Sequence, residues 1–303
     1  MNIIKHENDF IRHIVTIKNL SNKTIIAYKS DLNDFFNFIT DSKIKEISSN
    51  TIFSYFESLS KFKKLKDTTI NRKIITLKQY FTYLEEYHKY KNPFIKLKFR
   101  FKKEKKLPKT LTIYEIKLLL SILKKNTFTS TSFQQFESYR DLALIDLLIS
   151  TGIRIGEACK ITLNDINLVD KVILIHGKGR KERVIYISSL DTYRNIKKWL
   201  KIRKKHISYT DHLFINRYGK CLTINSIDNI FRKYKKLSKI NPLATPHFLR
   251  HTFATNLLSN GADIRSVQEI LGHANVSTTE IYTEVTNNRK KEVLSKYNYR
   301  NNI

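Results

Sequence analysis

Glycine is missing from the first half of this 303-residue chain, and all seven glycines lie at or after Gly152. Glycine supplies the positive backbone angles of tight turns and hairpins. Its absence therefore argues against a succession of strands in the first hundred residues and predicts helix after helix. The length is that of two domains, each with a core of its own.

Cysteines and long apolar runs are scarce as well. Cys159 and Cys221 give neither a disulfide framework nor a CxxC metal pattern, which indicates a reducing, cytoplasmic compartment. The longest apolar run, residues 142–150, is broken by Asp146 and predicts a buried helix, because it is much shorter than a membrane span. The first ten residues include acids and lack the apolar core of a signal peptide, so neither membrane association nor secretion is expected.

Acidic residues are outnumbered by basic ones. The chain has 56 Lys and Arg against 27 Asp and Glu, a formal charge of +29. A bias toward Lys codons explains part of this excess, as the heavy use of Ile and Asn suggests. It does not explain why the number of Asp and Glu residues is not correspondingly high. Such an excess of positive charge favours a polyanionic partner, because binding releases the counterions of the polyanion. We expect this partner to be double-stranded DNA.

Apolar residues recur at helical spacing through four segments of the first hundred residues, at about 8–20, 22–40, 48–60 and 68–86. Ser21 is expected to cap the second helix, and Val15 is expected on the buried face of the first. In the fourth helix the spacing places three basic side chains on the outward face, where they would contact DNA: Arg72, Lys73 and Lys78.

A dense basic stretch, residues 96–110, separates this helical block from the rest and is predicted to be an interdomain linker. It is either a strap along DNA phosphates or a solvated connector, and the net charge favours the strap. The predicted DNA contacts in it are Arg100, Lys102, Lys103, Lys105 and Lys106.

The second half mixes helices with one hairpin. Thr112 is expected to cap a helix, and a long helix is expected to run to Ser150. Two β-branched runs, 171–176 and 182–188, are joined by GKGRK, which indicates an antiparallel hairpin. The fold class is therefore mainly α, with a helical domain at 1–95 and a mixed α/β domain with a small antiparallel sheet at 111–303.

The segment TGIRIGEA, from Thr151, carries the first candidate site residue. Gly152 ends the buried helix and Arg154 stands where a new helix begins, so its planar guanidinium is combined with free main-chain N–H groups that suit a phosphate. Glu157, one turn on, would hold the guanidinium. The alternative is a surface ion pair of little energetic value.

The hairpin tip carries the second candidate, Lys178, between Gly177 and Gly179. These glycines let the ammonium approach a ligand closely, and neighbouring cations would lower its pKa toward that of a proton donor. Taken by itself, this pattern favours a solvated turn lysine over a functional one.

Residues 245–285 carry the remaining candidates. Thr245 is expected to cap a helix whose buried face includes Leu258, with Pro246 at its first position and His247 and Arg250 on one face. Asn260-Gly261 should end this helix, and Asp263 and Gly272 should bound the next one, with His273 beyond it. Ser277 and Glu280 are expected to form a capping box for a helix carrying Tyr282.

No metal site is expected from the two histidines His247 and His251, although they are four residues apart. No acidic or cysteine ligands accompany them. His251 is expected to be a buried, hydrogen-bonded side chain instead.

Taken together, TGIRIGEA, GKGRKERVIYI and HFLRHTFATNLLSNGADIRSVQEILGHANVSTTEIYTEV resemble the catalytic domain of the tyrosine recombinases, or phage integrase family, and are most similar to its Xer-like branch. The first hundred residues resemble that family's helical, SAM-like core-binding domain. The resemblance covers nearly the whole chain and all six reactive positions.

The resemblance implies a role for each position. Tyr282 would attack the scissile phosphate and form a 3′-phosphotyrosyl link, and Lys178 would protonate the departing 5′ oxygen. Arg154 and Arg250 would neutralise the nonbridging oxygens. His247 would be an acid/base partner, His273 a further donor to the phosphate, and Glu157 a supporting residue. Neither metal nor another cofactor is implied, because covalent capture conserves the bond energy.

The family's assembly implies four protomers on two DNA sites, or a paired recombinase, passing through a Holliday junction. The segment after Tyr282 would dock into a neighbour through Val293 and Leu294. Two other functions share the charge and the domains: a type IB topoisomerase-like enzyme that relaxes DNA, and a non-catalytic architectural DNA-binding protein.

Overall fold

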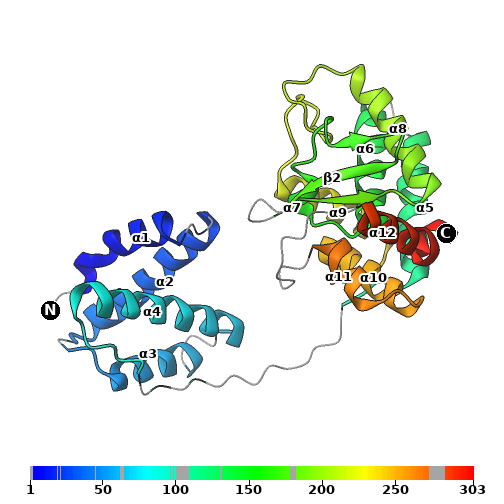
Figure 1. Cartoon of the computed structure of the whole chain (residues 1–303). Helices are drawn as coiled ribbons and strands as arrows, with labels where there is room; N and C mark the ends of the chain where they lie inside the picture. The colour runs from blue at the N-terminus through cyan, green and yellow to red at the C-terminus, as the bar shows by residue number, and fades with distance from the viewer. Residues whose placement is uncertain are drawn as a thin grey trace. The chain divides into compact units, whose positions relative to one another are not determined.

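The computed structural model describes residues 3–18, 20, 22–44, 46–61, 65–95, 97, 99, 109–129, 132–177, 182–272 and 284–303. The chain forms two compact units, residues 1–105 and 106–303 (Figure 1). This division falls inside the predicted linker, whose limits stay a prediction. Eleven predicted positions lie outside the described residues: Ser21, Arg100, Lys102, Lys103, Lys105, Lys106, Lys178, His273, Ser277, Glu280 and Tyr282.

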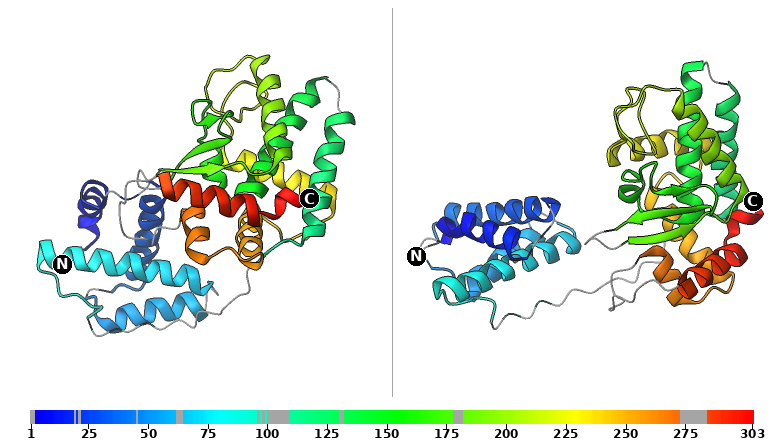
Figure 2. Two further views of the ribbon diagram at one scale, coloured as in Figure 1. Left: turned by 45° about the vertical axis from the view of Figure 1, so that its right-hand side comes forward. Right: turned by 45° about the horizontal axis from the view of Figure 1, so that its top comes forward.

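The N-terminal unit consists of helices (Figure 2), as the lack of glycine predicts. The core between them is rich in aromatic side chains. Helix α4 packs against both α2 and α3, while α1 packs against α2. Val15 is exposed, so its predicted place on the buried face of α1 is wrong. The elements are η1 (Ile3–His6), α1 (Glu7–Thr16), α2 (Asn22–Asp41), α3 (Ser49–Lys61) and α4 (Asp67–His88).

The outward face predicted for α4 is only partly correct. Lys78 is exposed and Arg72 is partly exposed, but Lys73 is only 3% accessible. Its ammonium lies 3.0 Å from the carboxylate of Asp31, which is fully buried on α2, and also contacts Asp34. The outward placement of Lys73 is therefore wrong, because a buried carboxylate requires a cationic partner that the spacing along α4 does not reveal.

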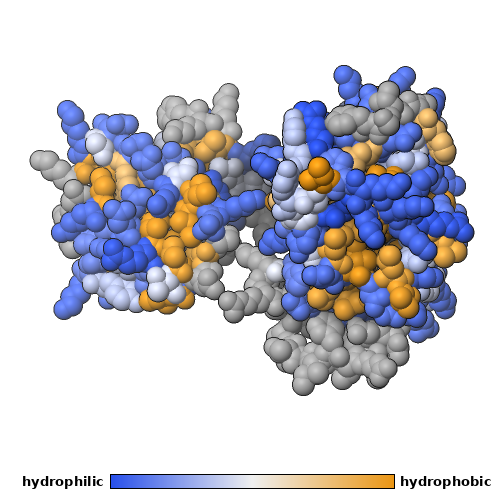
Figure 3. Space-filling view, turned by 90° about the horizontal axis from the view of Figure 1, so that it is seen from above, coloured by the Kyte–Doolittle hydropathy of each residue, from blue (hydrophilic) through white to orange (hydrophobic). Residues whose placement is uncertain are grey.

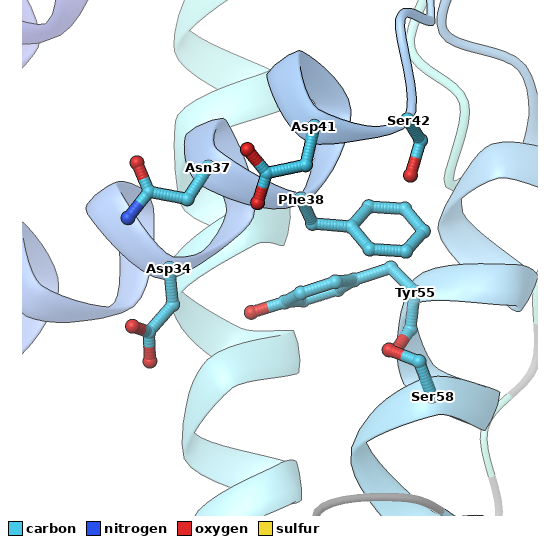
Figure 4. Close-up of a pocket in the computed structure, with 7 residues that line it drawn as sticks. All are labelled: Asp34, Asn37, Phe38, Asp41, Ser42, Tyr55 and Ser58. Atoms are coloured by element: carbon cyan, nitrogen blue, oxygen red, sulfur yellow. The ribbon is translucent and has the colours of Figure 1, made fainter.

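A pocket of about 280 Å³ lies between α2 and α3 of this unit (Figure 4). Asp34, Asn37 and Asp41 line one side of it, and the Tyr55 hydroxyl points toward that side. Carboxylates of this kind repel a phosphate. The pocket is therefore no candidate for the DNA site.

The C-terminal unit begins with two long helices, α5 (Ile113–Thr129) and α6 (Ser132–Thr151). The side-chain hydroxyl of Thr112 accepts a hydrogen bond from the main chain of Glu115, and the Glu115 carboxylate accepts one from the main chain of Thr112. The predicted cap is thus confirmed as a reciprocal capping box. Helix α6 supplies the most buried part of the core and packs against α5, α8 and α10.

A three-stranded antiparallel sheet follows in the order β1-β2-β3. The predicted hairpin is confirmed as β2 (Val172–His176) and β3 (Glu182–Tyr186), paired from Val172↔Tyr186 to His176↔Glu182. Strand β1 (Ile166–Asn167) is too short to show a periodic pattern and was not predicted. Between α6 and the sheet lies the single-turn helix α7 (Ile155–Ala158).

The described part of this unit continues with α8 (Leu190–Lys204), α9 (Ile224–Ser238), α10 (Pro246–Ser259), α11 (Ile264–Leu271) and α12 (Glu284–Tyr297), followed by η2 (Tyr299–Asn302). Asp263 caps α11 as predicted, and Gly272 ends it with φ +64°. Thr245 takes the position before α10, but its side chain makes no capping hydrogen bond, so that part of the prediction is wrong.

The C-terminal helix packs against its own domain. Val293 and Leu294 are buried in the core of the C-terminal unit, where α12 contacts β3 and α11. Arg300 in η2 is buried and donates to Asp146 of α6 from Nε, over 2.7 Å. The prediction that Val293 and Leu294 dock into a neighbour is not met in this structure, because both are already covered within the chain.

No helix within the described ranges has the length and apolarity needed to cross a membrane. In the view of Figure 3, hydrophilic side chains cover most of the described surface and separate several apolar patches. This largely hydrophilic surface agrees with a composition in which 27% of the residues are charged.

Candidate active site

Arg154 is held at the start of α7 by the chain on both sides of it. Gly152 reverses the chain after α6 with φ +63°, and a Cβ there would lie 2.4 Å from a ring carbon of Phe253, so only glycine fits. The Glu157 carboxylate then accepts from the Arg154 main-chain N–H over 2.9 Å and from its Nη1 over 3.0 Å. The sequence-based placement of Arg154 and Glu157 is confirmed.

Arg250 enters the same region from α10 and is 6% exposed. Its Nη1 donates to the main-chain oxygen of Gly152 over 2.8 Å, and its Nη2 donates to that of Leu271 over 2.7 Å. One guanidinium thus joins the end of α6 to the end of α11. These carbonyls fix its direction without neutralising its charge.

A third arginine, Arg183 of β3, was not predicted. It is also 6% exposed, and its Nη1 and Nη2 donate to the two Glu157 carboxylate oxygens over 3.1 and 2.8 Å. The strand carried a usable signal, since Arg183 falls on the same face as the buried Ile185 and Ile187, two and four residues further on. A cation on the inward side of a strand demands a buried carboxylate, and sequence alone does not say which.

His247 lies on α10, close enough to Arg250 and Arg154 for their positive charges to act on its ring. Partial burial lowers its pKa below the usual 6.5, and the positive fields of His251, Arg250 and Arg154 act in the same direction. The ring is therefore neutral at pH 7 and can accept a proton.

Two predicted details of α10 are wrong. His251 is exposed and not buried, and Leu258 is 41% exposed, because both lie on the side of the helix that faces away from the core. The rings of His247 and His251 are tilted with centroids 6.0 Å apart. Within the described part of the chain, no group of three or more His, Cys, Asp or Glu side chains is arranged to hold a metal ion.

The charge of this region is strongly positive. Burial lowers the pKa of Arg250 to about 10, and the repulsion from Arg154 adds to the effect. Burial by itself would raise the pKa of Glu157, but its bonds to Arg183 and Arg154 prevail and lower it, so the carboxylate is ionised. Arg154 and Arg183 thus share the Glu157 carboxylate, while Arg250 nearby is held by main-chain carbonyls alone, and a bound anion would offset the excess positive charge.

The hairpin stem that leads to Lys178 is held by His176. Its ring nitrogens contact Asp165 over 2.8 Å and Glu182, across the strand pair, over 3.0 Å. The hydrogen bond to Asp165 raises the pKa of His176 and outweighs partial desolvation, and Glu182 adds to the rise. Lys178, His273 and Tyr282 themselves lie outside the described residues, so their placement in the site stays a prediction.

Two family models match the chain. The model described as "Phage integrase family" matches residues 109–289, and "Phage integrase, N-terminal SAM-like domain" matches residues 8–88. A "Tyrosine recombinase" of Agathobacter rectalis is 38% identical, with 97% of this chain and 96% of that protein covered. A "Tyrosine recombinase XerC" of Thermodesulfovibrio yellowstonii is 36% identical, with 95% and 94% covered.

A solved structure shares the architecture. The XerH site-specific recombinase bound to palindromic difH substrate, in a post-cleavage complex, matches with a TM-score of 0.73 at 25% identity. The match covers 95% of this chain and 84% of that one.

Proposed function

The chain belongs to the phage integrase family and is a Xer-like tyrosine recombinase, a site-specific DNA recombinase, and we propose that it cuts and rejoins duplex DNA through a 3′-phosphotyrosyl link to Tyr282. The observation that supports this most is the group of Arg154, Arg183 and Arg250 around a single carboxylate, Glu157. Such a site is preorganised for the charge of a phosphodiester under attack.

The proposed reaction exchanges one phosphodiester for another. The phenolic oxygen of Tyr282 forms a bond to phosphorus, the bond from phosphorus to the 5′ oxygen breaks, and the 5′ oxygen leaves as a hydroxyl. The phenolic proton passes to a base, for which neutral His247 is suited. Lys178 supplies the proton to the leaving oxygen. Rejoining reverses these steps with a new 5′ hydroxyl, so no cofactor is consumed.

Arg154 and Arg250 are proposed to bind the nonbridging oxygens of that phosphate, with His273 as a further donor. A transition state for attack on phosphorus spreads negative charge over these oxygens, so fixed cations stabilise it more than the ground state. Arg250 is suited to this role because main-chain carbonyls orient its guanidinium while leaving it positively charged.

DNA binding is proposed to extend beyond this pocket. XerH is bound to its difH substrate in its complexes, and the charge of +29 of this chain favours duplex DNA as a partner. Exposed Lys78, partly exposed Arg72 and the basic stretch 96–110 would contact phosphates. We further propose that four protomers assemble on two DNA sites, or that the protein pairs with a second recombinase. The proposed compartment is the cytoplasm.

Nicked suicide duplexes drawn from the flanking genome test the proposal, because the nick lets the cleaved 5′ fragment diffuse away and traps the covalent protein. Wild type should form a protein–DNA adduct, while Tyr282→Phe should form none and still shift DNA in a gel. An adduct that survives Tyr282→Phe contradicts the assigned nucleophile. Relaxation of plasmids without recombinant products would favour the topoisomerase-like function, and shifted DNA without any adduct would favour the architectural one.

A further inference from the structure

The buried Arg183 makes a set of contacts that the proposed reaction does not by itself require. Its three guanidinium nitrogens all donate: Nη1 and Nη2 to the Glu157 carboxylate, and Nε to the main-chain oxygen of Ile270 over 2.9 Å. With 6% of its surface exposed, the group is enclosed by protein. Arg183 is therefore placed to act on other residues and not on DNA.

We propose that Arg183 is a positioning residue that sets the orientation of Arg154 through the Glu157 carboxylate, an inference that rests on the proposed function. Glu157 is the one acceptor that both arginines share: Oε1 receives Arg154 Nη1 and Arg183 Nη1, and Oε2 receives the Arg154 main-chain N–H and Arg183 Nη2. Rotation of the Glu157 carboxylate would displace the Arg154 guanidinium that is bonded to it. Arg183 prevents this rotation because it donates to both carboxylate oxygens.

The contact with Ile270 fixes Arg183 itself. Arg183 and Arg250 hold two consecutive carbonyls at the end of α11, those of Ile270 and Leu271. Carbonyls at a helix C-terminus are unpaired within the helix and carry partial negative charge, so cations stabilise them. Arg183 thereby links three segments that are distant in sequence: β3, the start of α7 and the end of α11.

Arginine is required for this set of bonds. A planar guanidinium can grip both oxygens of one carboxylate and still donate from Nε in another direction, whereas an ammonium is a point donor on a flexible stem. Lysine at position 183 would keep the charge near Glu157 but would lose the grip on both oxygens. Arg183→Lys therefore separates orientation from charge.

The chain offers a matched control in Arg203 of α8. It is also 6% exposed, and its guanidinium donates to the main-chain oxygens of His212 and Thr210 over 3.0 and 2.8 Å. It makes no contact with Glu157 among the described residues. Arg203→Lys therefore replaces a comparably buried guanidinium in the same domain without changing a bond to the site residues.

The test compares cleavage of two nicked suicide duplexes that are identical except at the scissile position, which carries either a phosphodiester or a methylphosphonate. The methyl group removes the nonbridging charge that a well-placed Arg154 neutralises. Arg183→Lys should slow phosphodiester cleavage by on the order of 100-fold, the effect of a misplaced reacting group, and should slow methylphosphonate cleavage much less. The ratio of the two rates is independent of the fraction of protein that is folded.

The same ratio is measured for the controls. Arg203→Lys should leave it at the wild-type value, and adding Arg183→Lys to Arg154→Ala should cause little further loss. An equal loss on both substrates, or a ratio for Arg183→Lys that matches that of Arg203→Lys, overturns the positioning role while leaving the proposed function intact. Failure of the proposed function is recognised separately, because wild type then forms no adduct with the phosphodiester.

Discussion

Arg250 on α10 donates from Nη2 to the main-chain oxygen of Leu271, 2.7 Å away at the end of α11. These residues are 21 positions apart, and α11 ends one residue before the segment that contains His273 and Tyr282. The proposed phosphate ligand is therefore also a structural link to the chain that leads to the proposed nucleophile. Its removal should affect chemistry and stability together.

We expect Arg250→Lys to slow formation of the covalent adduct by about 10²–10³-fold, the loss typical of one transition-state donor. An ammonium cannot hold the Gly152 and Leu271 carbonyls and face a phosphate at once. Single-turnover cleavage of a nicked duplex measures the loss. Arg194→Lys, at an exposed position, is the control, and equal rates for the two variants would contradict the role.

Lys73 and Lys78 of α4 should behave in opposite ways. Lys73→Ala removes a partner of the buried Asp31, so we expect the free energy of unfolding to fall by about 3 kcal/mol. Lys78→Ala should leave stability within about 0.5 kcal/mol but reduce the salt dependence of DNA affinity by about one unit of slope. Urea denaturation and DNA titrations at several salt concentrations measure these quantities. A stable Lys73→Ala with weakened DNA binding would reverse our assignment.

His247 should set the acidic limb of the pH profile of kcat/KM. Its pKa lies below 6.5 in the folded protein, so the ring stays neutral, and able to take the tyrosine proton, until the pH falls below that value. The unfolded chain binds a proton at His247 more readily than the folded protein does. The contribution of neutral His247 to the free energy of unfolding is therefore fully present above pH 6.5, and it is lost as the pH falls through the folded-state pKa. A limb above pH 6.5, or one unchanged in His247→Gln, would rule out His247 as the base.

The buried pair of Asp146 and Arg300 should hold the C-terminal segment on its own domain. Arg300→Met leaves the Asp146 carboxylate without its charged partner, and we expect about 3–5 kcal/mol of destabilisation in urea denaturation. The double change Asp146→Leu with Arg300→Leu should recover most of that loss, because no unpaired charge is then buried. If Arg300→Met is as stable as wild type, the segment is not held by this pair.

Gly272 and Gly261 offer a contrast between activity and stability. A Cβ at Gly272 would lie 2.9–3.2 Å from the Arg183 guanidinium, whereas at Gly261 it would meet only a ring carbon of Tyr297 at 3.6 Å. Both glycines have positive φ, so each change to alanine should cost about 1 kcal/mol or more in stability. Only Gly272→Ala should also slow cleavage by more than the decrease in the folded fraction of the protein explains. Equal slowing by Gly261→Ala would contradict the close approach as the cause.

The sequence by itself determined most of the helices, the hairpin and the identity of the proposed reactive residues. Periodicity located α2, α3 and α4, turn glycines located the β2–β3 hairpin, and the position of Arg154 followed from Gly152 and the start of a new helix. These features depend on residues close together in the chain. A local pattern is sufficient for them because capping, turn geometry and amphipathic spacing act over one or two turns.

Only the tertiary structure decided which charges are buried and which residue each one meets. Lys73 turns inward to Asp31 across 42 positions, and Arg183 reaches Glu157 across 26 and Ile270 across 87. Val293 and Leu294 are covered by the chain's own domain in the same way. Burial makes an unpaired charge costly, so the partner is selected by what packing brings within hydrogen-bond distance. Spacing along one strand or helix contains no information about that distance.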